Sequence, residues 1–168
     1  MKTSKQGKDL IKSFESFSPT AYWDVDGYSI GYGHHGAHAG QTISQAEAEK
    51  LMDQDLQAFE RTINSINPNL SQSQFDAAVS LCYNIGTTRF SNSNTAMLIA
   101  SDPTPRPELE QEWKEWRLAG GVVNQNLVNR RAKEWELYAK ASIKTNILAI
   151  AALAAVVAAS GALLLATN

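Results

Sequence analysis

Two carboxylic acids near the N-terminus have settings different enough to do acid–base chemistry together. Glu15 lies between Phe14 and Phe17 at the end of an apolar helical pattern, and Asp24 follows nine positions later in a strand-like segment. Apolar surroundings favour the neutral form of a carboxyl group, which suits a proton donor. A second carboxyl group, as base or nucleophile, completes what hydrolysis of a glycosidic bond needs. Two structural alternatives stay open, because helix glutamates are usually solvated and an aspartate before a turn often serves the turn.

A β-hairpin is expected to position the second carboxyl group. Aromatic and β-branched runs flank Asp26-Gly27, and this dipeptide is a strong signal for a two-residue turn. With the turn at these two residues, Asp24 faces Ser29 on the opposite strand. The pattern therefore predicts a carboxyl group and a hydroxyl group as neighbours on one face of the hairpin.

The rest of the chain predicts an α+β fold that is mainly helical, with one small β region. Apolar residues recur at helical spacing in several segments, and Ser44 and Ser71 each begin a capping box that opens a helix. Residues 31–40, with four glycines and three histidines, indicate a loop or an irregular strand. The helices are expected at residues 5–17, 44–66, 71–86, 108–119 and 124–140.

Composition and charge exclude some classes of function. The chain has 15 basic and 17 acidic residues and a formal net charge of -2, without the basic excess of a nucleic-acid-binding protein. Its one cysteine, Cys82, cannot form an internal disulfide and lies in an apolar stretch, so we expect it in the core. No nucleic-acid partner and no cofactor are expected.

The segment around the two carboxyl groups is similar to the active-site segment of phage-type lysozymes, glycoside hydrolase family 24, also called endolysins or muramidases. Residues 15–34 read ESFSPTAYWDVDGYSIGYGH. The family has a glutamate, eight residues, an aspartate, and then a threonine just before an Ile-Gly-x-Gly-His run. Residues 74–86, residues 113–121 and residues 127–134 resemble further signatures of the family, so the resemblance covers about residues 5–140.

The resemblance implies a lysozyme-like fold and cleavage of the β-1,4 bond between N-acetylmuramic acid and N-acetylglucosamine in peptidoglycan. Glu15 would donate the proton, Asp24 would stabilise positive charge on the sugar or activate water, and Ser29 would position that water. The chain departs from the family at Ser29, which stands in place of threonine, and in the spacing of four residues after Asp24 where five are usual. The tight turn is expected to compensate for the shorter spacing. Asp26 is a weaker alternative to Asp24 as the second carboxyl group of the site.

Three further residues are candidates for contact with the sugar: Trp23, Tyr32 and His34. Trp23 is expected to line the cleft, and His34 is expected also to order the hairpin. His34, His35 and His38 lie within five residues, but neither a cysteine nor a regular helical spacing supports a metal site. The family uses no metal, so none is expected.

A long apolar segment follows the part that resembles lysozymes. From Ile147 to Ala166 every residue is apolar or small, and a helix of this length, at about 1.5 Å per residue, reaches about 30 Å, the thickness of a bilayer core. The sequence therefore predicts a catalytic domain at residues 1–140, a connector at 141–146 and a transmembrane helix at 147–166. Alanines four apart in this segment indicate a face that packs against itself or against another membrane protein.

The location of the enzyme follows from its charges. Lysines precede the apolar segment and no charged side chain follows it, which favours the cytoplasmic or interior side of a host or virion membrane. Such an enzyme is held inactive by its location until the membrane fails, or belongs to a virus that contains a membrane and cuts the wall during entry; the second interpretation is preferred. Two other functions stay open: a lytic transglycosylase, and an inactive lysozyme-like module that binds glycan strands or scaffolds a viral membrane.

Overall fold

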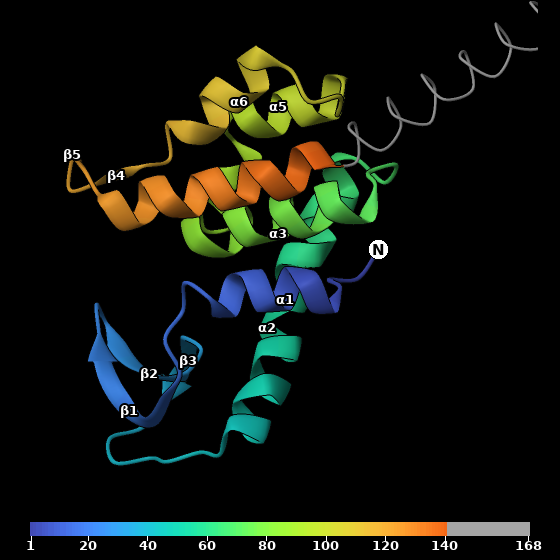
Figure 1. The fold of residues 1–168 in the computed structure, drawn as a ribbon. Helices are drawn as coiled ribbons and strands as arrows, with labels where there is room; N and C mark the ends of the chain where they lie inside the picture. The colour runs from blue at the N-terminus through green and yellow to red at the C-terminus, as the bar shows by residue number, and fades with distance from the viewer. Residues whose placement is uncertain (141–168) are drawn as a thin grey trace, which may run out of the picture.

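The computed structural model describes residues 1–140, which form a small β-sheet lobe and a larger helical lobe joined by one long helix (Figure 1). The predicted connector and the predicted transmembrane helix at residues 147–166 lie outside the described residues. Within residues 1–140, no helix combines the length and the apolar character needed to cross a bilayer. The mainly helical α+β architecture predicted from the sequence is confirmed.

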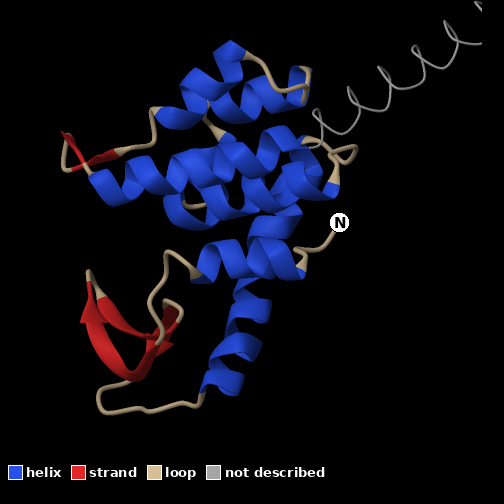
Figure 2. Cartoon of the chain, in the orientation of Figure 1, coloured by secondary structure: helices blue, strands red, loops and turns tan. Residues whose placement is uncertain are grey.

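The strands occur in two places along the chain, three of them between the first two helices and two after α6, and the rest of the described chain is mainly helical (Figure 2). In chain order the elements are α1 (Lys5–Lys12), β1 (Ser18–Asp24), β2 (Gly27–Gly31), β3 (His34–Ala37), α2 (Gln45–Ile66), α3 (Gln72–Ile85), α4 (Thr87–Ser91), α5 (Asn94–Ser101), α6 (Pro107–Lys114), β4 (Leu118–Ala119) and β5 (Val122–Val123). A further helix covers residues 125–140.

The sheet of the small lobe has the order β1-β2-β3 with antiparallel pairs. The predicted register of its first hairpin is wrong by two residues: Asp24 pairs with Gly27 instead of Ser29, and Tyr22 is the residue that faces Ser29. The two turn residues are Val25 and Asp26, and no residue other than glycine has a positive φ within residues 1–140. The backbone therefore does not adopt the turn with positive φ that the Asp-Gly signal favours, and the signal misplaced the turn.

The long helix α2 and the central helix α3 begin where the sequence predicts. Ser44 and Ser71 each accept a hydrogen bond from the backbone three residues later, and Glu47 and Gln74 complete the two capping boxes. These caps satisfy backbone N–H groups at each helix N-terminus. The helix α1 is shorter than predicted, because its regular part ends at Lys12 and only one further turn reaches Glu15.

The core lies around α3, which is buried over most of its length. Cys82 is fully buried there, as predicted, and burial raises the pKa of its thiol to about 12.

The helix predicted over residues 108–119 is shorter in the structure, where α6 ends at Lys114. Gly120 and Gly121 both have positive φ, which closes the tight β4–β5 hairpin.

Candidate active site

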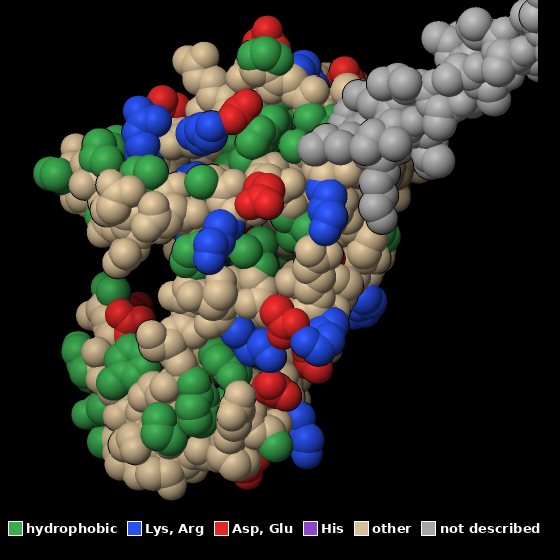
Figure 3. All heavy atoms as spheres, in the orientation of Figure 1, with side chains coloured by type: hydrophobic (Ala, Val, Ile, Leu, Met, Phe, Trp, Pro, Cys, Tyr) green, Lys and Arg blue, Asp and Glu red, His purple; other side chains and the backbone are tan. Residues whose placement is uncertain are grey.

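A cleft of about 620 Å³ separates the sheet lobe from the helical lobe. Figure 3 shows the surface hollowed between the lobes on the side where both hairpins project, with acidic side chains at the edge of the hollow. The residues that line the cleft come from the end of α1, the sheet, α2 and the end of α3: Glu15, Tyr22, Asp24, Gly33, His35, Gln54, Asp55, Gln57, Ala58, Phe59, Arg61, Tyr83 and Asn84. Both carboxyl groups singled out in the sequence belong to this set.

Glu15 lies one turn beyond α1, where its backbone N–H donates to the carbonyl of Ile11 at 3.0 Å. Its side chain is only 26% exposed, and Arg130 donates a hydrogen bond from Nη1 to Glu15 Oε1 at 2.6 Å. The guanidinium of Arg130 also lies 5.4 Å from the ring centre of Phe14. The prediction of apolar surroundings for Glu15 is therefore only partly correct. Phe14 is nearby, but the carboxyl group itself is paired with Arg130.

Arg130 is itself held by a buried ionic cluster. Arg130, Arg131 and Glu134 are all buried, and Glu134 accepts from Arg130 Nε at 3.1 Å and from Arg131 Nη2 at 2.8 Å. Ser80 and Trp113 donate to the same carboxylate at 2.7 and 3.2 Å. These ion pairs join three charged residues within one turn of the helix of residues 125–140. Because the cluster fixes Arg130, it also fixes the position of the group that holds Glu15.

Asp24 lies at the end of β1, next to the turn. Its Oδ1 accepts a hydrogen bond from the backbone N–H of Val25 at 3.0 Å, and the same side chain lines the cleft. Asp24 therefore stabilises the turn and is also available to the site. Asp26, the substitute considered for Asp24, has a side chain that is 81% exposed, lies 3.5 Å from His35 and does not line the cleft. The structure therefore favours Asp24 over Asp26 as the second carboxyl group of the site.

Two tyrosines of the cleft were not anticipated from the sequence. Burial and the negative charges of Asp24 and Glu15 raise the pKa of Tyr22, so this side chain is within electrostatic reach of both carboxyl groups. Burial and the charges of Glu15 and Asp55 raise the pKa of Tyr83, whose hydroxyl donates to the carbonyl of Tyr32 at 2.7 Å. Tyr22 escaped notice because the predicted register put Asp24 in its place opposite Ser29.

The other residues predicted for the site do not line the cleft. Ser29 is buried, and its hydroxyl lies 3.4 Å from Nδ1 of His35. Trp23 is 65% exposed with its ring edge against Tyr28, and Tyr32 is buried against Phe17. His34 pairs with Asp55 at 2.9 Å, which links the sheet to α2 beside the cleft.

The histidines have separate neighbours. His34 contacts Asp55, His35 contacts Asp26 and Ser29, and His38 contacts the carbonyl of Ala39. Across the part of the chain that the structure describes, no three His, Cys, Asp or Glu side chains are grouped so that they could hold a metal ion.

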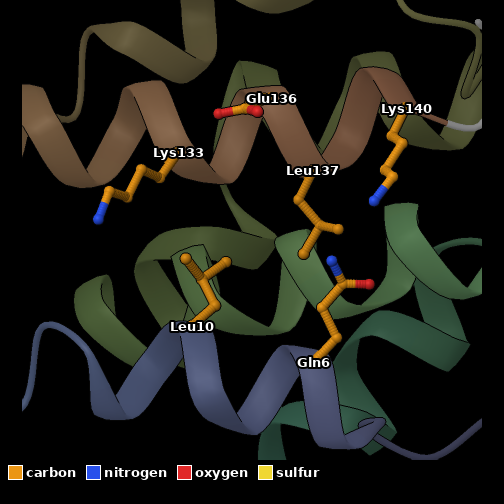
Figure 4. Close-up of a pocket in the computed structure, with 6 residues that line it drawn as sticks. All are labelled: Gln6, Leu10, Lys133, Glu136, Leu137 and Lys140. Carbon is orange, nitrogen blue, oxygen red and sulfur yellow. The ribbon is translucent and has the colours of Figure 1, made fainter.

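A second hollow of about 350 Å³ lies between α1 and the helix of residues 125–140. Figure 4 shows Leu10 and Leu137 facing each other across it, with Lys133 and Lys140 at either end and Glu136 turned away. Among the described residues around it, Glu136 is the only carboxylic acid, so this hollow lacks the pair of acids that glycosidic hydrolysis uses.

The two aspartates of the hairpin provide a matched test of the site. If the cleft cleaves peptidoglycan as the resemblance implies, Asp24→Asn is expected to lower the rate of cell-wall clearing by at least about 10²-fold, because it removes a charge from the cleft. Asp26→Asn removes the same charge two residues away, outside the cleft, and is expected to stay within about threefold of the unmodified protein. Initial rates of turbidity loss measure both effects. Equal losses in the two variants would contradict the assignment of Asp24.

Comparison with known proteins gives one consistent family. The family model described as "Phage lysozyme" matches residues 12–134. An endolysin of Bacillus phage PZA is 38% identical over 144 residues, covering 82% of this chain and 55% of the relative, and an endolysin of Lactococcus phage c2 is 35% identical over 152 residues, covering 83% and 61%. The chain thus spans little more than half the length of these two relatives.

Solved structures show the same similarity over nearly all of their own length. The muramidase domain of SpmX from Asticaccaulis excentricus is 34% identical with a TM-score of 0.75, covering 82% of this chain and 97% of that domain. A mutant of P22 lysozyme is 29% identical with a TM-score of 0.71, covering 82% of this chain and 98% of its own.

Proposed function

Because the chain belongs to the phage lysozyme family, we propose that it hydrolyses the β-1,4 bond between N-acetylmuramic acid and N-acetylglucosamine in bacterial peptidoglycan. The observation that supports this most is the presence of Glu15 and Asp24 in one cleft between the lobes. A paired acid and carboxylate in an open groove suit a long polysaccharide strand that must lie across them.

Glu15 is the proton donor in this proposal. Its carboxyl group protonates the glycosidic oxygen, while Arg130 fixes the carboxyl group through a hydrogen bond to Oε1. Asp24 stabilises the positive charge that develops on the sugar ring, or activates water against it. Ser29 contacts His35, which lines the cleft, so we assign the Ser29 hydroxyl to holding His35 rather than to contacting Asp24 directly.

Hydrolysis is favoured over the other candidate functions. The similarity to proteins described as endolysin, muramidase and lysozyme supports hydrolysis rather than a lytic transglycosylase reaction. The two carboxyl groups in the cleft support an active enzyme rather than a module that only binds glycan. Loss of turbidity of a suspension of purified cell walls on adding the protein tests the proposal, and an unchanged suspension would contradict it.

We also propose that residues 147–166 tether the enzyme to a host or virion membrane, where its partners are the lipid bilayer and neighbouring helices. The run of apolar and small residues in this segment, which contains no charged side chain, supports the tether. Replacing Leu153 and Val157 with lysine raises the free energy of membrane insertion, because each charge at the middle of a spanning helix costs about 2.5–3.5 kcal/mol. The unmodified chain is expected in the membrane pellet after a carbonate wash, and the double variant in the supernatant. The same distribution for both chains would contradict the tether.

A further inference from the structure

The hollow between α1 and the helix of residues 125–140 forms a basic groove, remote from the cleft between the lobes. Leu10 and Leu137 face each other across it, and Lys133 and Lys140 lie at its two ends (Figure 4). Leu137 is buried and Leu10 is half-buried, so the middle of the groove is apolar, whereas both lysines are exposed. Such a groove suits a molecule that joins an anionic head to an apolar body.

The two lysines of the basic groove keep their positive charges unneutralised within residues 1–140. Lys133 lies 5.5 Å from the ring centre of Phe14, and neither lysine forms an ion pair with a carboxylate of the described residues. Glu136 follows Lys133 by three residues and precedes Lys140 by four, but its side chain is turned away from the groove (Figure 4). The lysines of α1, by contrast, are all paired with aspartates or glutamates.

The basic groove also lies next to the start of the proposed tether. Lys140 is the last residue that the structure describes, and the apolar segment begins at Ile147. The six connecting residues span at most about 25 Å, and Lys133 lies about 10 Å further back along its helix. With residues 147–166 in a bilayer, the groove is therefore within reach of the lipid headgroups.

We propose that the basic groove binds an anionic phospholipid of the membrane to which the chain is tethered; this rests on the proposed tether. Lys133 and Lys140 attract the phosphate of the headgroup, because basic side chains beside a membrane segment are drawn to a negatively charged bilayer surface. Leu10 and Leu137 contact the first carbons of an acyl chain. The bound lipid holds the catalytic domain against the membrane. Since the groove and the cleft share no lining residue, the cleft stays open to the wall.

Protection of individual lysines from acetylation tests this assignment. The full-length protein is mixed with vesicles of phosphatidylcholine, with vesicles that also contain phosphatidylglycerol, or with glycerol 3-phosphate, which is a headgroup without acyl chains. A brief pulse of a water-soluble acetylating reagent follows, and mass spectrometry gives the rate at each lysine. Lys50 and Lys114 are internal controls, because they lie on α2 and α6 and do not line the groove. Flotation of the vesicles measures membrane association separately.

Vesicles that contain phosphatidylglycerol are expected to slow acetylation of Lys133 and Lys140 about three- to tenfold and that of Lys50 and Lys114 less than about twofold. Phosphatidylcholine alone and glycerol 3-phosphate are expected to protect none of the four. Lys133→Gln is expected to raise the fraction of phosphatidylglycerol that half-protects Lys140 by at least about twofold, and Lys50→Gln to leave it unchanged.

Three results would overturn the assignment: equal slowing at all four lysines, no slowing with phosphatidylglycerol, or the same slowing with phosphatidylcholine or glycerol 3-phosphate. Flotation with vesicles of phosphatidylcholine alone reports on the tether. Its absence counts against the tether, whereas selective protection of Lys133 and Lys140 by phosphatidylglycerol still supports the lipid site.

Discussion

Replacing Glu15 with glutamine is expected to lower the rate of cell-wall clearing by about 10²–10⁴-fold, the usual contribution of a general acid. Glutamine has nearly the same shape as glutamic acid but has no proton that it can give to a leaving oxygen. Its amide oxygen can still accept the hydrogen bond that Arg130 donates to Oε1 of Glu15. The substitution therefore removes the proton and retains the contact that positions the side chain.

The matched control for this variant is Glu136→Gln. Glu136 is exposed, lies in the helix of residues 125–140 and does not line the cleft between the lobes. Its replacement is expected to leave clearing unchanged. Circular dichroism and the urea midpoint show whether Glu15→Gln is folded. A folded Glu15→Gln variant that retains more than about a tenth of the clearing rate would exclude Glu15 as the proton donor.

Replacing Glu134 with glutamine is expected to lower the free energy of unfolding by about 3–5 kcal/mol. Glu134 is the carboxylate shared by Arg130 and Arg131, and all three side chains are buried. Without the charge of Glu134, two guanidinium groups remain in the interior. Within residues 1–140, Arg130 still has Glu15 as a counterion, whereas Arg131 loses the carboxylate with which it is paired. The amide nitrogen of glutamine would also meet N–H donors, because Trp113 and both arginines donate toward this position.

Urea unfolding followed by tryptophan fluorescence measures this loss, because Trp113 contacts the cluster directly. Glu136→Gln again serves as control and is expected to stay within about 0.5 kcal/mol of the unmodified protein. A change below about 1 kcal/mol in Glu134→Gln would mean that water or backbone groups compensate the two arginines. A loss of clearing beyond that caused by unfolding is expected as well, since Arg130 would no longer be fixed beneath Glu15.

The parts of the fold that the sequence predicts correctly are those determined by local chemistry. The capping boxes at Ser44 and Ser71 place the starts of α2 and α3, because a serine and a glutamate or glutamine three residues later satisfy the free backbone N–H groups at a helix N-terminus. The burial of Cys82 likewise follows from its apolar neighbours. The short helices α4 and α5 were not predicted, because a few residues carry too little apolar periodicity.

The candidate site depends on contacts that local patterns do not contain. The hairpin register follows from how β1 bulges between Ser18 and Tyr22 and pairs with β2, so the Asp26-Gly27 signal alone put Asp24 opposite Ser29 and hid Tyr22. The pairing of Arg130 with Glu15 joins positions 115 residues apart, and no spacing rule reaches so far. The sequence therefore singles out two carboxyl groups that the structure places in one cleft, while the packing of the two lobes decides what surrounds them.

The products of wall digestion test the central claim most directly. If Glu15 and Asp24 form a hydrolytic pair across the cleft, soluble fragments from purified peptidoglycan carry reducing N-acetylmuramic acid ends, each with one water added across the broken bond, and their mass shows it. Fragments that carry anhydro ends, lighter by one water, or a wall that releases no fragments at all, would contradict the account.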